Sequence, residues 1–386
     1  MFAYLSYTPF RTLYAISMRN VVSSIAWSPD SRVFAAVTAG EHVGNDITKV
    51  SVWRASDGRE LYTYSYPAAP FGASRLAWSP DGSSFAIAWD DGNVNIWSAA
   101  NDYSSWQEQS SFHLHLHASP KYYFLTGFAW SADGKHLVMG YADGELHVWD
   151  IIGEHALPTV QAPVVQRTFL SLSPYGSGAI VPAILSLSPD GTQAIVPVFL
   201  SSSPDQTQAT VPGQQASGND ATYATWDFIT GKEVIFSPFQ NLLNADGGPP
   251  YFAWSDDGKA LAVSDGRKVM TWQWNEQGNS WTFVRSIAVG TSNREIQALA
   301  WSPDRKRLAT ADSPDVIRMW SASSGQLLGP FRLPLYDPPV SKAEAYYDSD
   351  AAISGLAWSP NGTYLLSGNG AGQVILRAVL FWGSAP

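Results

Sequence analysis

Three histidines at alternate positions form the most chemically suggestive cluster in the sequence. His113, His115 and His117 occur in the segment HLHLH. Alternate residues share one face of a β-strand, and imidazole is a common zinc ligand. However, positions 113 and 117 would lie about 13 Å apart along a strand, whereas zinc ligands lie about 2 Å from the ion. The three cannot bind one ion together, so we predict no metal site, with an adjacent pair as the alternative.

Other catalytic chemistry has no recognisable motif. The chain contains no cysteine. It also lacks a Gly-x-Ser-x-Gly elbow, a phosphate-binding glycine loop and a His-Glu-x-x-His zinc motif. Most aspartates fall in predicted turns, where an Asp side chain accepts backbone N–H groups. We therefore predict a protein that is not an enzyme, with no cofactor.

Composition limits the partners. The 386 residues carry a net charge of −10, which opposes binding to nucleic acid, and the densest basic cluster is only DRKRL at 304–308. No run of 18 apolar residues occurs, so we predict no membrane insertion. With 45% hydrophobic residues and 17 tryptophans the chain can bury a large core. We expect a monomeric, cytoplasmic protein.

One phrase recurs along the chain and defines the elements that would position any site. It reads IAWSPDS at 25–31, LAWSPDG at 76–82, FAWSADG at 128–134, FAWSDDG at 252–258, LAWSPDR at 299–305 and LAWSPNG at 356–362. Each copy joins an apolar strand to a tight-turn sequence and a second apolar run. The phrase predicts a β-hairpin.

A third strand ending in Trp follows most copies, about 19 residues after the first Trp. We predict that tryptophans at these two positions pack between repeats: Trp27, Trp53, Trp78, Trp97, Trp130, Trp149, Trp226, Trp254, Trp272, Trp301, Trp320 and Trp358. Asp91, Asp143 and Asp220 each lie six residues before a third-strand Trp and are predicted to brace turns.

Four strands in each repeat are typical of a propeller blade. We predict a single all-β domain over 1–386, a seven-bladed β-propeller of four-stranded antiparallel blades. The last repeat has no fourth strand, whereas FRTLYAIS at 10–17 precedes the first repeat as a spare outer strand. Pairing of this N-terminal strand with the last blade would close the ring.

The fourth repeat contains a 15-residue unit in three copies, FLSLSPYGSGAIVPA, ILSLSPDGTQAIVPV and FLSSSPDQTQATVPG, over residues 169–213. Leu172 aligns with the first-strand Trp, and Trp226 ends the third strand. The distance between them exceeds the usual spacing by 35 residues, of which two extra copies explain 30. We predict that one copy occupies the blade and that the others are an insertion.

These residues resemble the WD40-repeat family, in its bacterial form with AWSPDG hairpins, over nearly the whole chain. At the end of the third strand the Trp-Asp pair survives only at Trp149-Asp150 and Trp226-Asp227, and the usual Gly-His pair is absent. The resemblance implies that the family's buried Asp–His–Ser/Thr–Trp network cannot form in full. It also implies a protein-binding function, and in bacterial members a frequent link to signalling modules such as kinases.

We therefore expect a non-catalytic scaffold that binds a protein or peptide partner. Residues near the turn between second and third strands are the predicted partner contacts: Trp89, Tyr141, Asp312 and Asn369. Trp89 could equally pack between blades. The alternative is a hydrolase or lyase whose carboxylates or histidines meet in the central channel.

Overall fold

The computed structural model is all-β in the residues that it describes. These are residues 10–18, 20–38, 48–66, 74–89, 92–113, 125–131, 133–141, 145–157, 160–161, 170–172, 178–180, 186–187, 193–199, 210–211, 214–215, 221–227, 232–240, 251–255, 259–264, 267–275, 280–289, 296–311, 316–332 and 353–380. No helix that could cross a bilayer occurs within these ranges.

Antiparallel sheets, most of four strands in chain order, follow one another along the chain. The first sheet contains β2 (Val22–Trp27), β3 (Val33–Thr38), β4 (Thr48–Arg54) and β5 (Glu60–Tyr66). The second contains β6 (Ser74–Trp78), β7 (Ser84–Trp89), β8 (Asn93–Ala99) and β9 (Trp106–His113). The third contains β10 (Leu125–Trp130), β11 (His136–Tyr141) and β12 (Glu145–Asp150), with β13 (His155–Ala156) and β14 (Val160–Gln161) both paired to β12.

The remaining sheets repeat this order. The fourth contains β17 (Ser186–Leu187), β18 (Gln193–Phe199), β21 (Ala221–Asp227) and β22 (Lys232–Gln240). The fifth contains β23 (Tyr251–Trp254), β24 (Ala260–Ser264), β25 (Lys268–Asn275) and β26 (Ser280–Ala288). The sixth contains β27 (Ala298–Trp301), β28 (Arg307–Ala311), β29 (Val316–Ser321) and β30 (Leu327–Arg332). The last contains β31 (Ile353–Trp358), β32 (Tyr364–Asn369), β33 (Gln373–Val379) and the N-terminal β1 (Phe10–Ser17).

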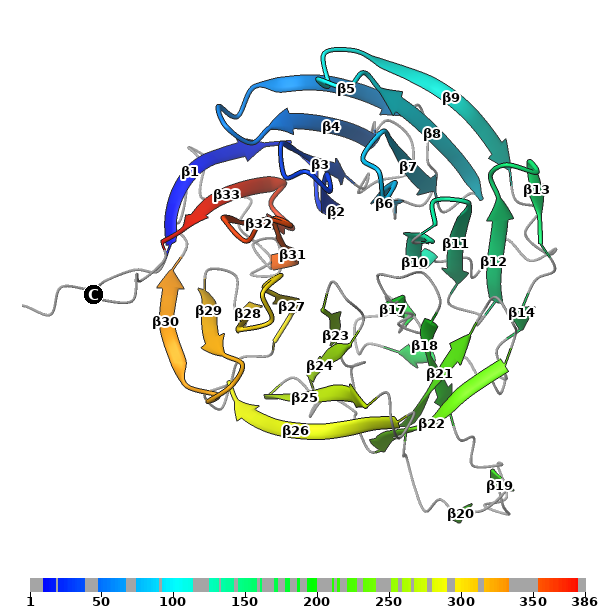
Figure 1. Ribbon diagram of the computed structural model, residues 1–386, viewed down its shortest axis with the longest axis vertical. Helices are drawn as coiled ribbons and strands as arrows, with labels where there is room; N and C mark the ends of the chain where they lie inside the picture. The colour runs from blue at the N-terminus through cyan, green and yellow to red at the C-terminus, as the bar shows by residue number, and fades with distance from the viewer. Residues whose placement is uncertain are drawn as a thin grey trace, which may run out of the picture.

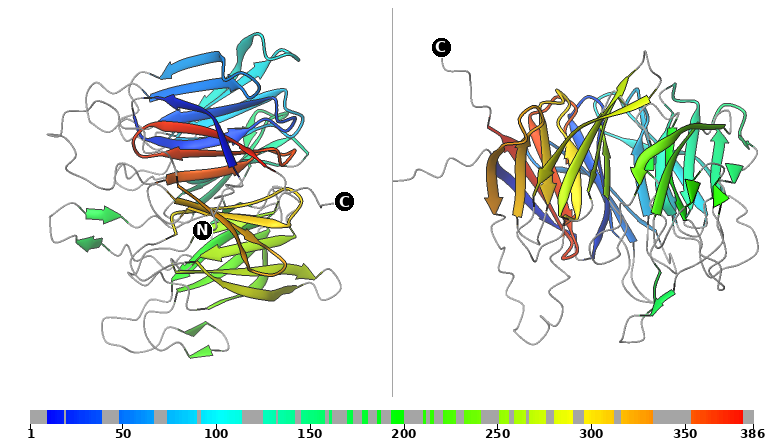
Figure 2. Two further views of the ribbon diagram at one scale, coloured as in Figure 1. Left: turned by 90° about the vertical axis from the view of Figure 1, so that its left-hand side faces the viewer. Right: turned by 90° about the horizontal axis from the view of Figure 1, so that it is seen from below.

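These sheets lie side by side around a ring, each with its first strand innermost and its fourth strand outermost (Figure 1). Seen edge-on, the strands run between the two faces of the ring (Figure 2). The predicted all-β architecture of four-stranded antiparallel sheets is confirmed, and it is consistent with a β-propeller.

The AWSPDG phrase forms its hairpin through local hydrogen bonds. In the second sheet the Ser79 hydroxyl donates to Asp81 Oδ1 (2.6 Å) and accepts from the Ser84 N–H (3.0 Å). Asp81 Oδ1 in turn accepts the N–H of Ser83 (3.0 Å). The next residue, Gly82, has φ of +71°, a backbone region that glycine enters without steric cost. Corresponding Ser–Asp contacts form at Ser28, Ser131 and Ser302, so the turn is encoded locally.

The first-strand tryptophans link neighbouring sheets. Four of them donate the indole N–H to the carbonyl of the Ala before the first-strand Trp of the preceding sheet: Trp130 to Ala77 (3.1 Å), Trp301 to Ala253 (3.1 Å), Trp358 to Ala300 (3.2 Å) and Trp27 to Ala357 (3.2 Å). Hydrophobic clusters fill the same junctions, for example Val37 and Val50 of the first sheet with Phe85 and Trp97 of the second. Burial of these large side chains stabilises the contact between sheets.

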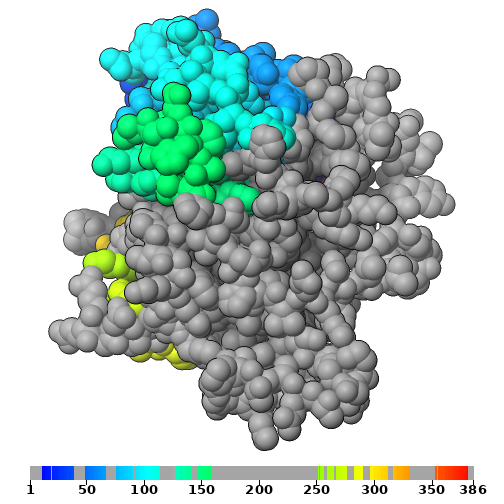
Figure 3. Space-filling model, turned by 90° about the vertical axis from the view of Figure 1, so that its right-hand side faces the viewer, coloured from blue at the N-terminus to red at the C-terminus, as the bar shows by residue number. Residues whose placement is uncertain are grey.

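The predicted packing tryptophans differ in their burial. Nine are buried: Trp27, Trp53, Trp78, Trp97, Trp130, Trp272, Trp301, Trp320 and Trp358. Trp149 and Trp254 are half-buried, and Trp149 stacks on Phe112 of the second sheet with ring centroids 3.9 Å apart. In the space-filling view the second (cyan) and third (green) sheets accordingly form one continuous surface (Figure 3). The side chain of Trp226 lies outside the described residues.

Part of the family's hydrogen-bond network forms at the third-strand position. In the sixth sheet Trp320 donates to the hydroxyl of Thr310 on the second strand (3.0 Å). In the last sheet Arg377 replaces Trp and donates to Ser367, which stands at the same spacing of ten residues (2.8 Å). Arg377 is fully buried, and burial lowers its pKa to about 9. Arg377 thus makes the contact that an indole N–H makes elsewhere.

The N-terminal strand belongs to the last sheet. β1 pairs antiparallel with β33, from Phe10 opposite Val379 to Ser17 opposite Gln373. The apolar side chains of β1 pack with Val374 and Leu376 and with Trp27 of the first sheet. Residues 10–17 therefore supply the outer strand that the last repeat lacks.

The triplicated segment divides among three sheets. β17 and β18 come from the second copy and pair with β21, with Ala194 opposite Trp226. The first copy forms a separate pair, β15 (Leu170–Leu172) with β16 (Gly178–Ile180). The third contributes β19 (Thr210–Val211), which pairs with β20 (Gln214–Gln215). The alignment that put Leu172 at the Trp position is therefore wrong, because Leu187 of the second copy holds it.

Candidate functional site

The turns between second and third strands lie at one end of the ring, which we call the bc face. The strand register places the start of β6, the end of β7, the start of β8 and the end of β9 at this end of the second sheet, because Ser74 pairs with Trp89 and Asn93 with His113. Antiparallel order puts the end of β5 there too. Three of the four predicted partner contacts, Trp89, Tyr141 and Asn369, end second strands and hence lie at this face.

Trp89 is buried and does not offer a surface contact. Its relative exposure is 0%. Tyr66 at the end of β5 stacks on it, with ring centroids 4.2 Å apart, and its indole N–H donates to Asn95 Oδ1 (2.7 Å). The expectation of an exposed aromatic at Trp89 is wrong, because a tyrosine from the neighbouring sheet covers the ring. Packing between sheets, the other interpretation, describes its position.

Asn369 is also buried, with 5% of its surface exposed. Its Oδ1 accepts the N–H of Gln373 (2.8 Å) and its Nδ2 donates to Gln373 Oε1 (3.0 Å). It therefore holds the turn between β32 and β33, and its predicted role as a surface contact is wrong. The side chain of Tyr141 and all of Asp312 lie outside the described residues. So do the proposed turn-bracing residues Asp91, Asp143 and Asp220.

Three polar side chains do reach the bc face of the first two sheets. Asn93 Nδ2 donates to the Tyr66 hydroxyl (2.9 Å), and Asn93 Oδ1 lies 3.0 Å from Nδ1 of the exposed His113. Tyr66 and Asn93 are half-buried. Together they form a row from the end of β5 to the end of β9. In the sequence His113 stands out only as a metal candidate, since its contact to Asn93 depends on strand register.

Buried groups support this row from below. Asn95 accepts from Trp89, as above, and its Nδ2 donates to Glu108 Oε1 on β9 (2.9 Å). Trp89 thus lies between the ring of Tyr66 and the amide of Asn95. A side chain fixed on both sides in this way holds the Tyr66 ring in one orientation, which lowers the entropic cost of binding a partner there.

The inner strands carry one charged side chain in their described residues, Arg75 on β6. The other described residues of β2, β10, β17, β23, β27 and β31 are apolar, glycine, serine, threonine or tyrosine. Arg75 Nη1 donates to the Ser23 carbonyl on β2 (3.1 Å), and the adjacent Leu76 N–H donates to the Ser24 hydroxyl (3.3 Å). The guanidinium is therefore positioned at the junction of the first two sheets, near the bc end of the inner wall.

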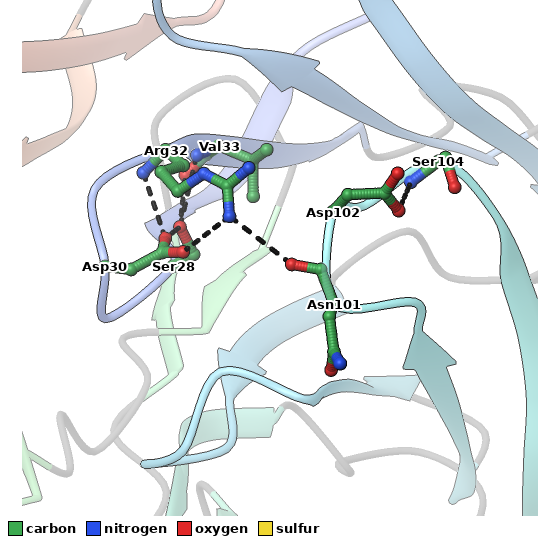
Figure 4. Close-up of polar contacts among 7 residues, drawn as sticks. All are labelled: Ser28, Asp30, Arg32, Val33, Asn101, Asp102 and Ser104. Atoms are coloured by element: carbon green, nitrogen blue, oxygen red, sulfur yellow. Dashed lines mark hydrogen bonds and ion pairs between the residues drawn. The ribbon is translucent and has the colours of Figure 1, made fainter.

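The opposite end of the same junction has a different chemistry (Figure 4). Arg32 Nη1 donates to the Asn101 carbonyl (3.3 Å), and its guanidinium carbon lies 5.5 Å from the centre of the Tyr103 ring. Asp30 Oδ2 lies 3.9 Å from the same Nη1, and Asp102 Oδ1 accepts the Ser104 N–H (3.0 Å). Burial is the main cause that raises the pKa of Tyr103 to about 12. These contacts join the turn between β2 and β3 to the turn between β8 and β9.

The turn aspartates cannot serve as general acids. A hydrogen bond from the Ser79 hydroxyl holds the pKa of Asp81 below its usual value, and one from Ser131 does the same for Asp133. Both carboxylates are ionised at neutral pH and occupied by turn contacts. Among the described residues no group of three His, Asp or Glu side chains could hold a metal ion, and His115 and His117 lie outside them.

Comparison with known proteins agrees with this architecture. A ring of antiparallel sheets joined by polar turns, with no assembled catalytic group in the described residues, is typical of repeat propellers that act as interaction modules. The family model "WD domain, G-beta repeat" matches residues 59–98, 108–150, 281–321 and 342–376. The chain thus contains WD40 repeats at these four positions, and the resemblance to WD40 repeats seen in the sequence is confirmed there. No curated protein matches the chain.

Proposed function

We propose that this chain is a non-catalytic interaction module that binds a protein or peptide partner on the bc face of its first two sheets. WD40 repeats generally mediate protein–protein interaction, and the proposal assigns that role to a particular surface. The observation that carries it is that Arg75, on the inner strand β6, and the row formed by Tyr66, Asn93 and His113, on third and fourth strands, lie at the same bc end of the first two sheets.

The charge of Arg75 defines the chemistry of the partner. A guanidinium is always protonated in proteins and binds carboxylates with two parallel hydrogen bonds. The chain as a whole carries a net charge of −10, which disfavours binding of an acidic partner at surfaces without such a cation. The partner in this proposal therefore presents an Asp, Glu or terminal carboxylate to Arg75, while the polar row accepts and donates hydrogen bonds at the rim.

The scaffold in this proposal is one domain over residues 1–386, a seven-bladed monomer closed by β1, with 169–213 as an insertion in the fourth blade. Contacts between the last and first sheets support closure. Trp27 donates to Ala357, and the Asn361 N–H donates to the Ser31 hydroxyl (3.0 Å). The described inner strands contain no Asp, Glu or His. This composition favours binding over the alternative of a hydrolase or lyase in the channel.

A pull-down with quantitative mass spectrometry tests the proposal. Tagged wild-type protein is compared with Arg75→Glu, Tyr66→Phe and, as a matched control on the opposite face, Asp102→Lys. We expect Arg75→Glu to lower recovery of the specific partner at least tenfold and Tyr66→Phe to lower it a few-fold, whereas Asp102→Lys leaves it unchanged. Equal circular dichroism melts establish that the variants are folded. If the partner were still recovered with Arg75→Glu but lost with Asp102→Lys, the partner would bind the opposite face and the proposal would be wrong.

A further inference from the structure

The fourth sheet has one position for a hairpin and three similar sequences that could fill it. The copies 169–183, 184–198 and 199–213 share the order of apolar residue, serine, proline turn and second strand. The structure gives them different partners. Only the second copy joins β21, while β15–β16 and β19–β20 form sheets of two strands.

The register shows what a replacement would require. In the present arrangement Ala194, Ile195 and Val196 stand opposite Trp226, Thr225 and Ala224. Exchange of the first copy for the second would bring Ala179, Ile180 and Val181 to the same positions, with identical residue types. Because a whole hairpin is replaced, the alternation of faces is preserved, and the usual barrier to a register shift is absent.

The differences between the copies rank them as competitors. The paired segment, which extends one residue beyond its copy, reads QAIVPVF at 193–199 for the second copy, GAIVPAI at 178–184 for the first and QATVPGQ at 208–214 for the third. The second copy presents the largest apolar side chains, which explains why it holds the position. The first differs at three positions, with Gly for Gln, Ala for Val and Ile for Phe. The third places Thr, Gly and Gln where the second has Ile, Val and Phe; glycine is unfavourable in a strand, and Thr and Gln offer less apolar surface than Ile and Phe.

We propose that the first and second copies exchange in the fourth sheet, so that this sheet has two registers 15 residues apart. With the second copy paired, one spare hairpin precedes the inner strand and another follows β18. With the first copy paired, both spare copies follow the second strand. Both connections leave and return at the bc face, because inner strands begin there and second strands end there. The exchange therefore moves one spare hairpin from the connection before the inner strand to the connection between the second and third strands.

Such exchange is a two-state equilibrium that a partner can shift. A partner that contacts the bc face and tolerates one arrangement of spare hairpins better than the other stabilises the corresponding register. This shift of the exchange equilibrium does not depend on which residues of the bc face the partner contacts.

Disulfide trapping tests the exchange, and the absence of native cysteine makes it unambiguous. In an antiparallel ladder the Cα–Cα distance of directly opposite residues alternates between two values, and only one of them suits a disulfide. Cysteines are therefore introduced at two consecutive pairs, so that one of the two pairs has the suitable distance. Ile195→Cys with Thr225→Cys and Val196→Cys with Ala224→Cys trap the second copy. Ile180→Cys with Thr225→Cys and Val181→Cys with Ala224→Cys trap the first. Thr210→Cys with Thr225→Cys probes the third copy.

In a glutathione redox buffer, followed by peptide mapping, we expect the second-copy disulfide to form completely. The first-copy disulfide should also reach completion, at least tenfold more slowly, and the third-copy disulfide at least tenfold more slowly again. First-copy cysteines that stay reduced while second-copy cysteines oxidise would overturn the proposal, since the second copy would then hold the position permanently. Equal rates for the first and third copies would overturn it too, because they indicate random collision of tethered chain.

A second measurement covers variants that fold poorly. Deletion of 184–198 should leave a cooperative melt, with the first-copy pair, introduced into the deleted chain, oxidising as fast as the second-copy pair does in the full chain. Loss of the cooperative melt on this deletion, but not on deletion of 169–183, would contradict the exchange.

Discussion

Two junctions of the ring solve the same packing problem with different contacts. Between the last and first sheets, Trp27 donates to Ala357 and stacks on Tyr364, with ring centroids 5.9 Å apart. Between the first and second sheets, Trp78 holds the equivalent position, but its indole nitrogen has no hydrogen-bond acceptor among the described residues. There Arg75 and Arg32 supply polar contacts at the two ends instead. Conserving a residue type at a repeated position therefore does not conserve its hydrogen bond.

The last-to-first junction has a close backbone approach at its bc end. A Cβ placed on Gly368 would lie 2.6 Å from Val22 Cγ1, so only glycine fits. At the same spacing in the first sheet, ten residues after the first-strand Trp, the buried residue is Val37. At the other end the Tyr14 hydroxyl donates to the Ser56 carbonyl (2.7 Å), and the Tyr14 ring lies against Gly58. The last-to-first junction thus combines a close backbone approach at one end with a polar contact at the other.

Removal of residues 2–17 should have the largest effect on this comparison. The deletion exposes the edge of β33 and removes the side chains of Leu13, Tyr14 and Ile16 from the core, at about 1.5–3 kcal/mol each. We expect the free energy of unfolding to fall by about 5 kcal/mol or more, measured by urea denaturation. A truncated protein that melted within a degree or two of the full chain and stayed monomeric would show that β1 does not close the ring.

Trp27→Ala and Trp130→Ala should each lower the free energy of unfolding by about 3–5 kcal/mol, because each empties a packed aromatic site. Phe substitutions sharpen the comparison of junctions. Trp27→Phe loses a hydrogen bond that Trp78→Phe does not lose, so it should cost about 1 kcal/mol more. If chemical denaturation gave equal losses for the two Phe variants, the hydrogen bond to Ala357 would contribute nothing.

Gly368→Ala should destabilise the last-to-first junction by about 1–3 kcal/mol through overpacking against Val22. Gly355→Ala is the matched control in the same sheet, since its added Cβ would lie an ordinary 3.5 Å from Ile25. The double variant Gly368→Ala with Val22→Ala should recover part of the loss relative to the sum of the single changes. Strictly additive losses in thermal denaturation would remove the steric explanation.

Arg305→Gly should have the smallest effect and be stabilising by about 0.5–1 kcal/mol, because Arg305 holds φ of +56° where other turns have glycine. Ser31→Gly relieves the same strain, with φ of +61°, but also deletes the hydroxyl that accepts the Asn361 N–H across the last-to-first junction. Its net gain should therefore be smaller. Denaturation curves showing the same gain for both would mean that this hydrogen bond adds no stability to the junction.

The candidate site could be predicted less completely than the fold. The bc face was identified because turn positions follow from strand order, but two of the four residues chosen there, Trp89 and Asn369, are buried. Their burial depends on Tyr66, 23 residues earlier in another sheet, and on a turn contact with Gln373. Arg75 gives no signal in the sequence, because a single arginine in an apolar strand is common. Its significance follows only from the comparison with the other inner strands, whose described residues carry no charge.

The sequence by itself determined the hairpins, since each AWSPDG turn is stabilised by hydrogen bonds within six residues. It also determined the tryptophan positions and the spare strand at residues 10–17, through the repetition of one pattern. Only the tertiary structure decided which of three equivalent copies pairs with β21, and that Arg377 makes the contact of the missing Trp. It alone also decided which repeated Trp finds an acceptor. These outcomes depend on side chains from neighbouring sheets, whose fit to one another no local pattern encodes.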